Sequence, residues 1–123
     1  MGVPILKHGD HLIATLQEDV GDDDLAELMH DISERIGRTR SRGVILDVSE
    51  LDVLDSYGTR TLRTIAQTTR MRGAATVIVG IQPGVAFAMV QLGLELDGVS
   101  TALDLEAGIE QLRLDIDARR AAI

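Results

Sequence analysis

Apolar positions along the chain follow two periods, which separate predicted strands from predicted helices. Apolar runs rich in β-branched residues are typical of strands. These runs lie over residues 3–8, 11–17, 43–48, 75–81 and 99–103. Apolar residues spaced three and four positions apart are typical of amphipathic helices. Such helices are predicted to begin at Asp22, Ser56, Pro83 and Asp104, and glycines 37, 73 and 93 are expected to end the first three.

The order of these elements predicts the fold class. The first two runs flank Gly9-Asp10, a pair typical of a tight turn, and form a hairpin. From there helix and strand alternate, which favours parallel pairing with helices packed on the sheet. We therefore expect one α/β domain over residues 1–123, with a mixed sheet, about four helices and a frayed tail at residues 119–123.

Composition excludes several classes of function. The 123 residues carry 12 Lys and Arg against 20 Asp and Glu, a formal net charge of −8. Such a chain is unsuited to non-specific binding of nucleic acid or of an anionic membrane. There is no cysteine, so thiol catalysis and thiolate metal sites are excluded. With no signal pattern and no apolar run of about 20 residues, we expect a cytoplasmic protein.

Histidine offers little evidence for a metal site. His8 and His11 flank the predicted turn and could approach each other. Two histidines with no third ligand in view favour a solvated turn over a metal centre. We therefore expect neither a metal nor a cofactor.

The stretch LDVLDSYGTRTL, residues 51–62, raises the main chemical question. Ser56 follows Asp55 at a predicted strand-to-helix turn, where a side-chain oxygen fits an N-cap that stabilises by about 1 kcal/mol. A helix start also offers free N–H groups and a positive dipole end to a phosphate. Cap and phosphate acceptor both remain open. A hydrolase nucleophile is disfavoured, because neither a Gly-x-Ser-x-Gly elbow nor a nearby histidine accompanies the serine.

The residues around Ser56 are expected to modify its role. Thr59, in the same first turn, is the second candidate acceptor. The environment of the acceptor is expected to include Asp47, Asp55 and Tyr57. A phosphate on Ser56 would bring nearly two negative charges beside Asp55, and near Asp52 if the loop folds back. The modified loop should therefore present a changed electrostatic face to any partner.

The helix over residues 83–92 is apolar around its whole circumference. A domain of this size can hardly bury all of it, so part of its surface is expected to meet a partner. The alternative is a core helix packed under the N-terminal hairpin. We expect the helix to lie beside the Ser56 turn, with docking residues Pro83, Val85, Phe87, Met89 and Val90.

Two stretches carry a resemblance to a known family. ILDVSELDVLDSYGTRTL resembles the strand–loop–helix signature of STAS domains, the fold of bacterial anti-sigma-factor antagonists. Gly80-Ile-Gln-Pro83, Val85-Ala86 and Thr101-Ala-Leu resemble the STAS proteins of stressosomes, and the similarity covers about residues 3–114. With no large N-terminal sensory domain, the chain is more similar to the small RsbS-type scaffold antagonists than to RsbR-type partners.

The resemblance implies a non-enzymatic phosphorylation switch. Proteins of this kind assemble with RsbR-like paralogues into a large stressosome that holds a serine/threonine switch kinase. Phosphorylation of the STAS serine releases the kinase, and a dedicated phosphatase resets the serine. The family's acceptor falls on Ser56 here. Gly58 departs from the bulkier apolar residue expected there, and either loosens the first turn or allows a neighbour to approach closely.

Three alternatives remain open at this point. The chain could be a simple antagonist that binds an anti-sigma kinase directly, without a large assembly. It could be a STAS module that binds a nucleotide or anion at the helix start. Its isolated form could be a homodimer.

Overall fold

The computed structural model describes residues 2–92 and 98–121. The strands in this part are β1 (Ile5–His8), β2 (His11–Thr15), β3 (Gly43–Asp47), β4 (Ala75–Val79) and β5 (Val99–Ala102). The helices are α1 (Asp22–Thr39), α2 (Ser56–Met71), α3 (Pro83–Gln91) and α4 (Leu105–Ala121). The predicted α/β class, with its opening hairpin, is confirmed.

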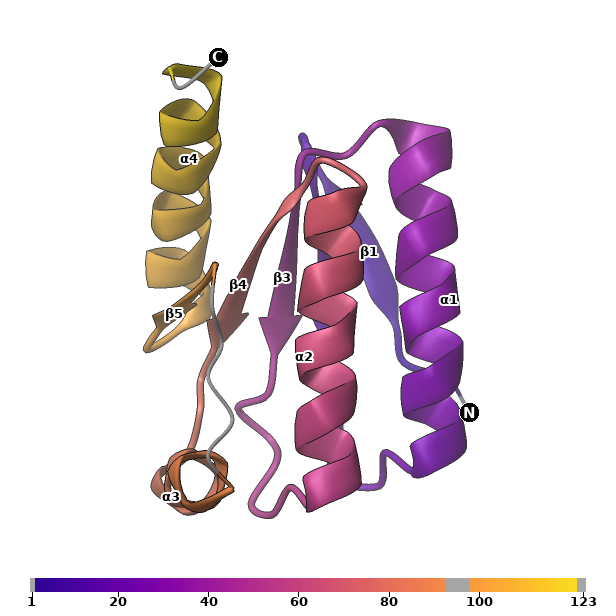
Figure 1. Ribbon diagram of the computed structural model, residues 1–123, viewed down its shortest axis with the longest axis vertical. Coiled ribbons are helices and arrows are strands. Elements are labelled where there is room, and N and C mark those ends of the chain that lie inside the picture. The colour runs from indigo at the N-terminus through magenta and orange to yellow at the C-terminus, as the bar shows by residue number, and fades with distance from the viewer. Residues whose placement is uncertain (1, 93–97, 122–123) are drawn as a thin grey trace.

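The strands follow one another across a single sheet in sequence order. β1 pairs with β2 antiparallel, and β2 to β5 are parallel, as the alternation of elements predicts. α1 and α2 lie side by side on one face, and α4 covers the other (Figure 1). The described residues contain no helix whose length and apolar content would let it cross a bilayer.

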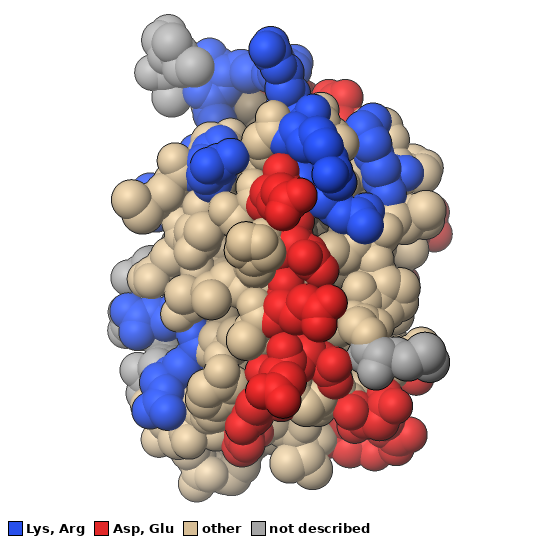
Figure 2. All heavy atoms as spheres, turned by 90° about the vertical axis from the view of Figure 1, so that its right-hand side faces the viewer, with Lys and Arg blue, Asp and Glu red and all other residues tan. Residues whose placement is uncertain are grey.

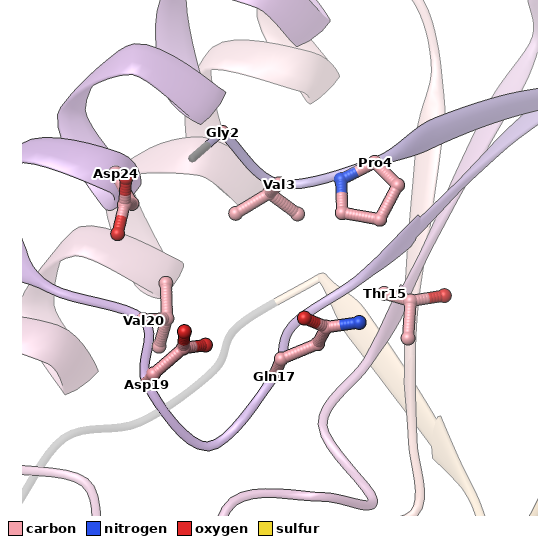
Figure 3. A pocket seen from close by; sticks show the side chains of 8 residues that line it. All are labelled: Gly2, Val3, Pro4, Thr15, Gln17, Asp19, Val20 and Asp24. Carbon is pink, nitrogen blue, oxygen red and sulfur yellow. The ribbon is translucent and has the colours of Figure 1, made fainter.

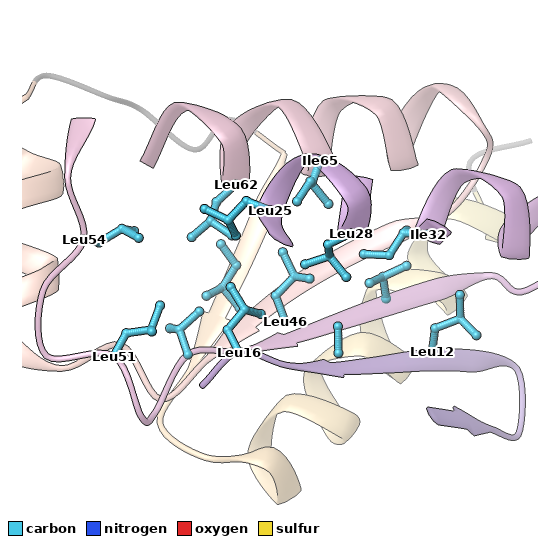
Figure 4. Close-up of a cluster of buried hydrophobic side chains, with 14 of the residues drawn as sticks. Leu12, Leu16, Leu25, Leu28, Ile32, Leu46, Leu51, Leu54, Leu62 and Ile65 are labelled. Atoms are coloured by element: carbon cyan, nitrogen blue, oxygen red, sulfur yellow. The ribbon is translucent and has the colours of Figure 1, made fainter. Parts of the chain in front are cut away.

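Two apolar clusters fill the two sides of the sheet. The larger lies under α1 and α2 and also takes in Leu51 and Leu54, which point into it from the segment before α2 (Figure 4). Val85 and Met89 of α3 belong to the same cluster. The smaller cluster lies under α4, around Leu112. Burying one leucine side chain contributes about 1.5–3 kcal/mol, so the segment before α2 is firmly attached to the core.

Two helix ends differ from the prediction. α1 does not end at Gly37 but continues to Thr39, and Arg40 adopts the left-handed conformation that ends it, with φ 56°. α4 runs through Ala121, so residues 119–121 of the predicted frayed tail are helical. Gly93, predicted to end α3, and residues 122–123 lie outside the described residues.

The turn between β1 and β2 makes stability depend on pH. The rings of His8 and His11 approach to 5.1 Å between centroids, as predicted. Burial and then the neighbouring His8 lower the pKa of His11 from 6.5, and Asp10 partly opposes this. The folded protein therefore binds this proton less readily than the unfolded chain. His11 thus destabilises the fold as the pH falls below its ordinary pKa.

We therefore expect the free energy of unfolding to fall more between about pH 7.5 and about pH 5.5 in the wild type than in His11→Gln. Urea denaturation at the two pH values measures this difference. Because His11 is only partly buried, the effect should be modest. Parallel pH profiles for the two proteins would contradict it.

Candidate functional site

The β3–α2 loop, residues 48–55, carries the chain from the carboxyl end of β3 to Ser56. The Val48 N–H donates to the carbonyl oxygen of Val79 at 3.0 Å, which continues the sheet pairing beyond β3. The Asp47 carboxylate accepts from the Ser49 N–H at 3.0 Å. Together with the buried Leu51 and Leu54, these bonds hold the loop in one conformation.

Asp55, rather than Ser56, caps α2. Its backbone is extended, and its Oδ1 accepts from the Gly58 N–H at 2.7 Å. Ser56 is the first helical residue and is exposed. The predicted cap role of Ser56 is therefore wrong, because the preceding carboxylate already satisfies the helix N–H group. The cap leaves the Ser56 hydroxyl on the surface at the positive end of the helix.

Thr59 does not fit the role of second acceptor. Its side chain is fully buried, and its hydroxyl donates to the carbonyl oxygen of Asp55 at 2.9 Å. A kinase could reach this oxygen only if the first turn of α2 unfolded. Of the two candidate acceptors, Ser56 alone lies on the surface.

Gly58 allows a neighbour to approach closely, the second of the two explanations offered for it. A Cβ atom at this position would lie 2.5 Å from Leu54 Cδ1 and 3.2 Å from Asp55 Oδ1. A larger residue would push the core leucine and the capping carboxylate away. The glycine therefore permits the tight turn that places Ser56 directly after its cap.

Acidic side chains dominate the surroundings of Ser56. Asp55 and Asp52 are exposed in the loop, as is Glu50, and Asp47 is half-buried at its start. Arg60 stands four residues after Ser56, on the same exposed side of α2. Arg60 was not predicted as part of the site, although its i, i+4 spacing from Ser56 within a predicted helix was a sufficient signal. One arginine only partly offsets this negative charge.

The start of α3 lies against the β3–α2 loop, as expected. Gln82 Nε2 donates to the carbonyl oxygen of Ser49 at 2.6 Å. A Cβ atom at Gly84 would lie 3.3 Å from the carbonyl oxygen of Asp52. The role of Gln82 was also missed, although it belongs to the Gly80-Ile-Gln-Pro83 stretch that carried the resemblance. It ties the beginning of α3 to the loop that precedes Ser56.

α3 divides into a buried side and an exposed side. Val85 and Met89 are buried, so these two predicted docking residues instead hold the helix to the core. Phe87 and Val90 are 65% and 78% exposed, and Pro83 is also exposed. The alternative of a fully buried helix is therefore wrong. Near Ser56, Val53 and Tyr57 are 79% and 39% exposed.

A hollow of about 270 Å³ lies at the amino-terminal segment, away from these residues. Figure 3 shows side chains from residues 2–4 and from the connection between β2 and α1 around it. None of the predicted site residues lines this hollow. Ser56 itself is exposed at the start of α2, which suits contact with a protein.

Comparison with known proteins agrees with this geometry. The family model of the STAS domain matches residues 3–107. The chain belongs to the STAS domain family. The resemblance that the sequence analysis gave is thereby confirmed.

Solved structures and a curated relative refine the relationship. A serine-to-glutamate variant of RsbS from Moorella thermoacetica is 32% identical, with a TM-score of 0.82 over 95% of this chain and 97% of that chain. A chain in a solved structure that describes the molecular architecture of the stressosome is 32% identical, with a TM-score of 0.80 over 90% of this chain and 96% of that chain. The RsbT co-antagonist protein RsbRA of Bacillus subtilis is 28% identical over 83 residues, which are 68% of this chain and 30% of RsbRA. The match to this curated relative therefore spans less than a third of its length.

Proposed function

We propose that this protein is a phosphorylatable scaffold that holds a serine/threonine switch kinase and releases it when Ser56 is phosphorylated. The observation that carries the proposal is the exposed Ser56 at the start of α2, beside a cap that does not use its hydroxyl. RsbR-like paralogues in a large assembly and a resetting phosphatase complete the proposal. The similarity to RsbS and to a stressosome chain supports this choice of partners.

The mechanism we propose is electrostatic. A phosphate adds about 1.5–2 negative charges at neutral pH. On Ser56 these charges would lie next to the exposed Asp52 and Asp55, with Arg60 as the nearby cation on α2. The helix dipole contributes only about half a positive charge. The phosphorylated turn therefore stays strongly negative, which weakens a partner surface that fits the unmodified turn.

Two alternatives are less favoured. A nucleotide or anion at the start of α2 would meet the same acidic side chains without a compensating cluster of cations. Direct antagonism of an anti-sigma kinase needs no paralogue, and the size of the protein alone and with an RsbR-like paralogue tests that difference. The relatives at 32% identity favour the larger assembly.

Variants of Ser56 test the proposal. With the switch kinase of its own signalling system and ATP, the wild type should gain one phosphate, located at Ser56 by mass spectrometry. Ser56→Ala should bind the kinase as the unmodified wild type does and should gain no phosphate. Ser56→Asp should weaken kinase binding by about tenfold or more, which corresponds to about 1.4 kcal/mol.

Thr64→Asp is the matched control, because it adds the same charge to an exposed position of the same helix. It should bind the kinase as the wild type does. Equal loss of binding in Thr64→Asp and Ser56→Asp, or phosphorylation of Ser56→Ala to the same extent as the wild type, would defeat the proposal.

A further inference from the structure

An arginine-rich surface lies at the end of the molecule opposite Ser56. α2 has 16 residues, so about 24 Å separate Ser56 at its start from Arg72 just beyond its end. Figure 2 shows Lys and Arg gathered at one end of the face over α1, above a column of Asp and Glu. A chain with a net charge of −8 does not lead one to expect this concentration of positive charge.

Two adjoining hollows contain these arginines. The first, about 320 Å³, is lined by Arg42, Gly73, Ile116, Arg119 and Arg120. The second, about 350 Å³, includes Arg40, Arg42, Arg72 and Gly73 in its lining. Arg42 and Gly73 belong to both hollows. We call the combined surface the arginine hollow, defined by Arg40, Arg42, Arg72, Arg119 and Arg120.

The arginines of the hollow form no direct ion pairs in the described part of the chain. Within residues 2–92 and 98–121, none of its five guanidinium groups forms a salt bridge. Of the nearby acids, Asp117 pairs with Arg113, whereas Asp115 accepts only from the neutral Ser100 and Gln111 and lines a hollow together with Arg119. Asp10 lines another hollow together with Arg120. α1, α2 and α4 all end on this side (Figure 1), but each helix end supplies only about half a negative charge. These acids and helix ends offset only part of the charge of the five guanidinium groups.

Local contacts position two of these arginines, Arg42 and Arg72. The Arg42 N–H donates to the carbonyl oxygen of Asp10 at 2.7 Å, and the Arg42 carbonyl accepts from the Ala75 N–H at 3.0 Å. The Arg72 guanidinium lies over Gly37, where any side chain would displace it. Arg40 holds φ 56°, a conformation that costs about 1–2 kcal/mol in residues with a Cβ atom.

We propose that the arginine hollow binds a compact oligophosphate through its phosphate groups. Guanidinium groups pair with phosphate oxygens by two parallel hydrogen bonds, and five of them suit more than one phosphate. The hollows have the dimensions of a small-molecule site. Among the described residues no aromatic side chain lines either hollow, so a base would find no aromatic ring there on which to stack. The same lack, together with the acidic remainder of the chain, disfavours nucleic acid.

Calorimetry on the purified protein tests this proposal. Inorganic tripolyphosphate should bind with one-to-one stoichiometry, and orthophosphate about tenfold or more weakly. ATP separates a free oligophosphate from a nucleotide, and it should bind within about threefold of tripolyphosphate because no base contact is expected. Arg72→Gln and Arg120→Gln should each weaken tripolyphosphate binding by about tenfold. Thermal unfolding establishes that the variants fold. If one of the two variants does not fold, the other is enough for the test.

A control that removes two positive charges, twice the loss in each single variant, separates a site from general attraction. The double variant Arg60→Gln/Arg63→Gln removes two exposed arginines from α2 outside the hollow and should bind within about twofold of the wild type. Ser56→Asp should also leave binding unchanged, so this result is independent of the switch proposed above. Equal weakening in the control, absence of saturable binding, or tighter binding of ATP or of single-stranded DNA than of tripolyphosphate would each overturn the proposal.

Discussion

Replacing Gly80 with alanine should lower the free energy of unfolding by about 3 kcal/mol, one of the largest losses expected from any single added methyl group in this protein. Gly80 has φ 76°, and a Cβ atom there would lie 2.6 Å from the Cβ and 2.9 Å from the Cα of Ser49. The left-handed backbone contributes about 1 kcal/mol of this loss. The collision with the β3–α2 loop contributes the rest, because a backbone atom cannot rotate away as a side chain can.

Gly73→Ala is the matched control for this prediction. Gly73 also has a positive φ, 87°, but nothing lies within 4 Å of a Cβ atom added there. We expect Gly73→Ala to cost only about 1 kcal/mol, the strain of the backbone alone. Urea denaturation gives both values. Amide chemical shifts should also change from Ser49 to Ser56 in Gly80→Ala but not in Gly73→Ala. Equal stability losses would mean that the close approach to Ser49 does not matter.

The periodicity of apolar residues was sufficient to predict the fold because it indicates which side chains are buried. Burial of these side chains stabilises the helices and strands. Continuous β-branched runs gave strands β3 and β4, both of which are buried in the middle of the sheet. The end of α1 was harder to predict. A glycine such as Gly37 often ends a helix, but here α1 continues through it and the Arg72 side chain packs against it. The left-handed residue that ends α1 is Arg40 instead.

The site was predictable in position but not in rotational detail. Asp and Ser are both favourable N-cap residues, so the sequence alone could not decide whether Asp55 or Ser56 caps α2. The choice places the capping carboxylate before the helix and the hydroxyl on its surface. Thr59 lies three residues before the buried Leu62, so it falls on the apolar stripe of α2, where its hydroxyl bonds to the backbone.

The apolar circumference of α3 explains the remaining errors. A helix that is apolar on all sides gives no signal for which side faces the core. Tertiary contacts make this choice: the Gln82 bond to Ser49 and the close approach of Gly84 to Asp52 fix the beginning of α3. Met89 then lies in the core, and Phe87 and Val90 face outward.

This division predicts opposite outcomes for neighbouring substitutions in α3. Met89→Asp buries a carboxylate among apolar side chains and should cost about 4 kcal/mol or more, seen as loss of the folded baseline in denaturation. The double variant Phe87→Asp/Val90→Asp changes two exposed side chains and should alter stability by less than about 0.5 kcal/mol. If α3 is part of the docking surface for the kinase or a paralogue, the double variant should weaken that binding by about thirtyfold, or about 2 kcal/mol.

Leu114→Asp provides the control for surface polarity, because Leu114 is 48% exposed on α4, the helix that covers the other face of the sheet. It should fold and bind partners as the wild type does. Sedimentation and biolayer interferometry with the kinase and with an RsbR-like paralogue measure the three variants side by side. A Phe87→Asp/Val90→Asp protein that binds both partners normally would remove α3 from the docking surface. An equal loss in Leu114→Asp would mean that added negative charge, rather than the lost apolar contact, weakens the complex.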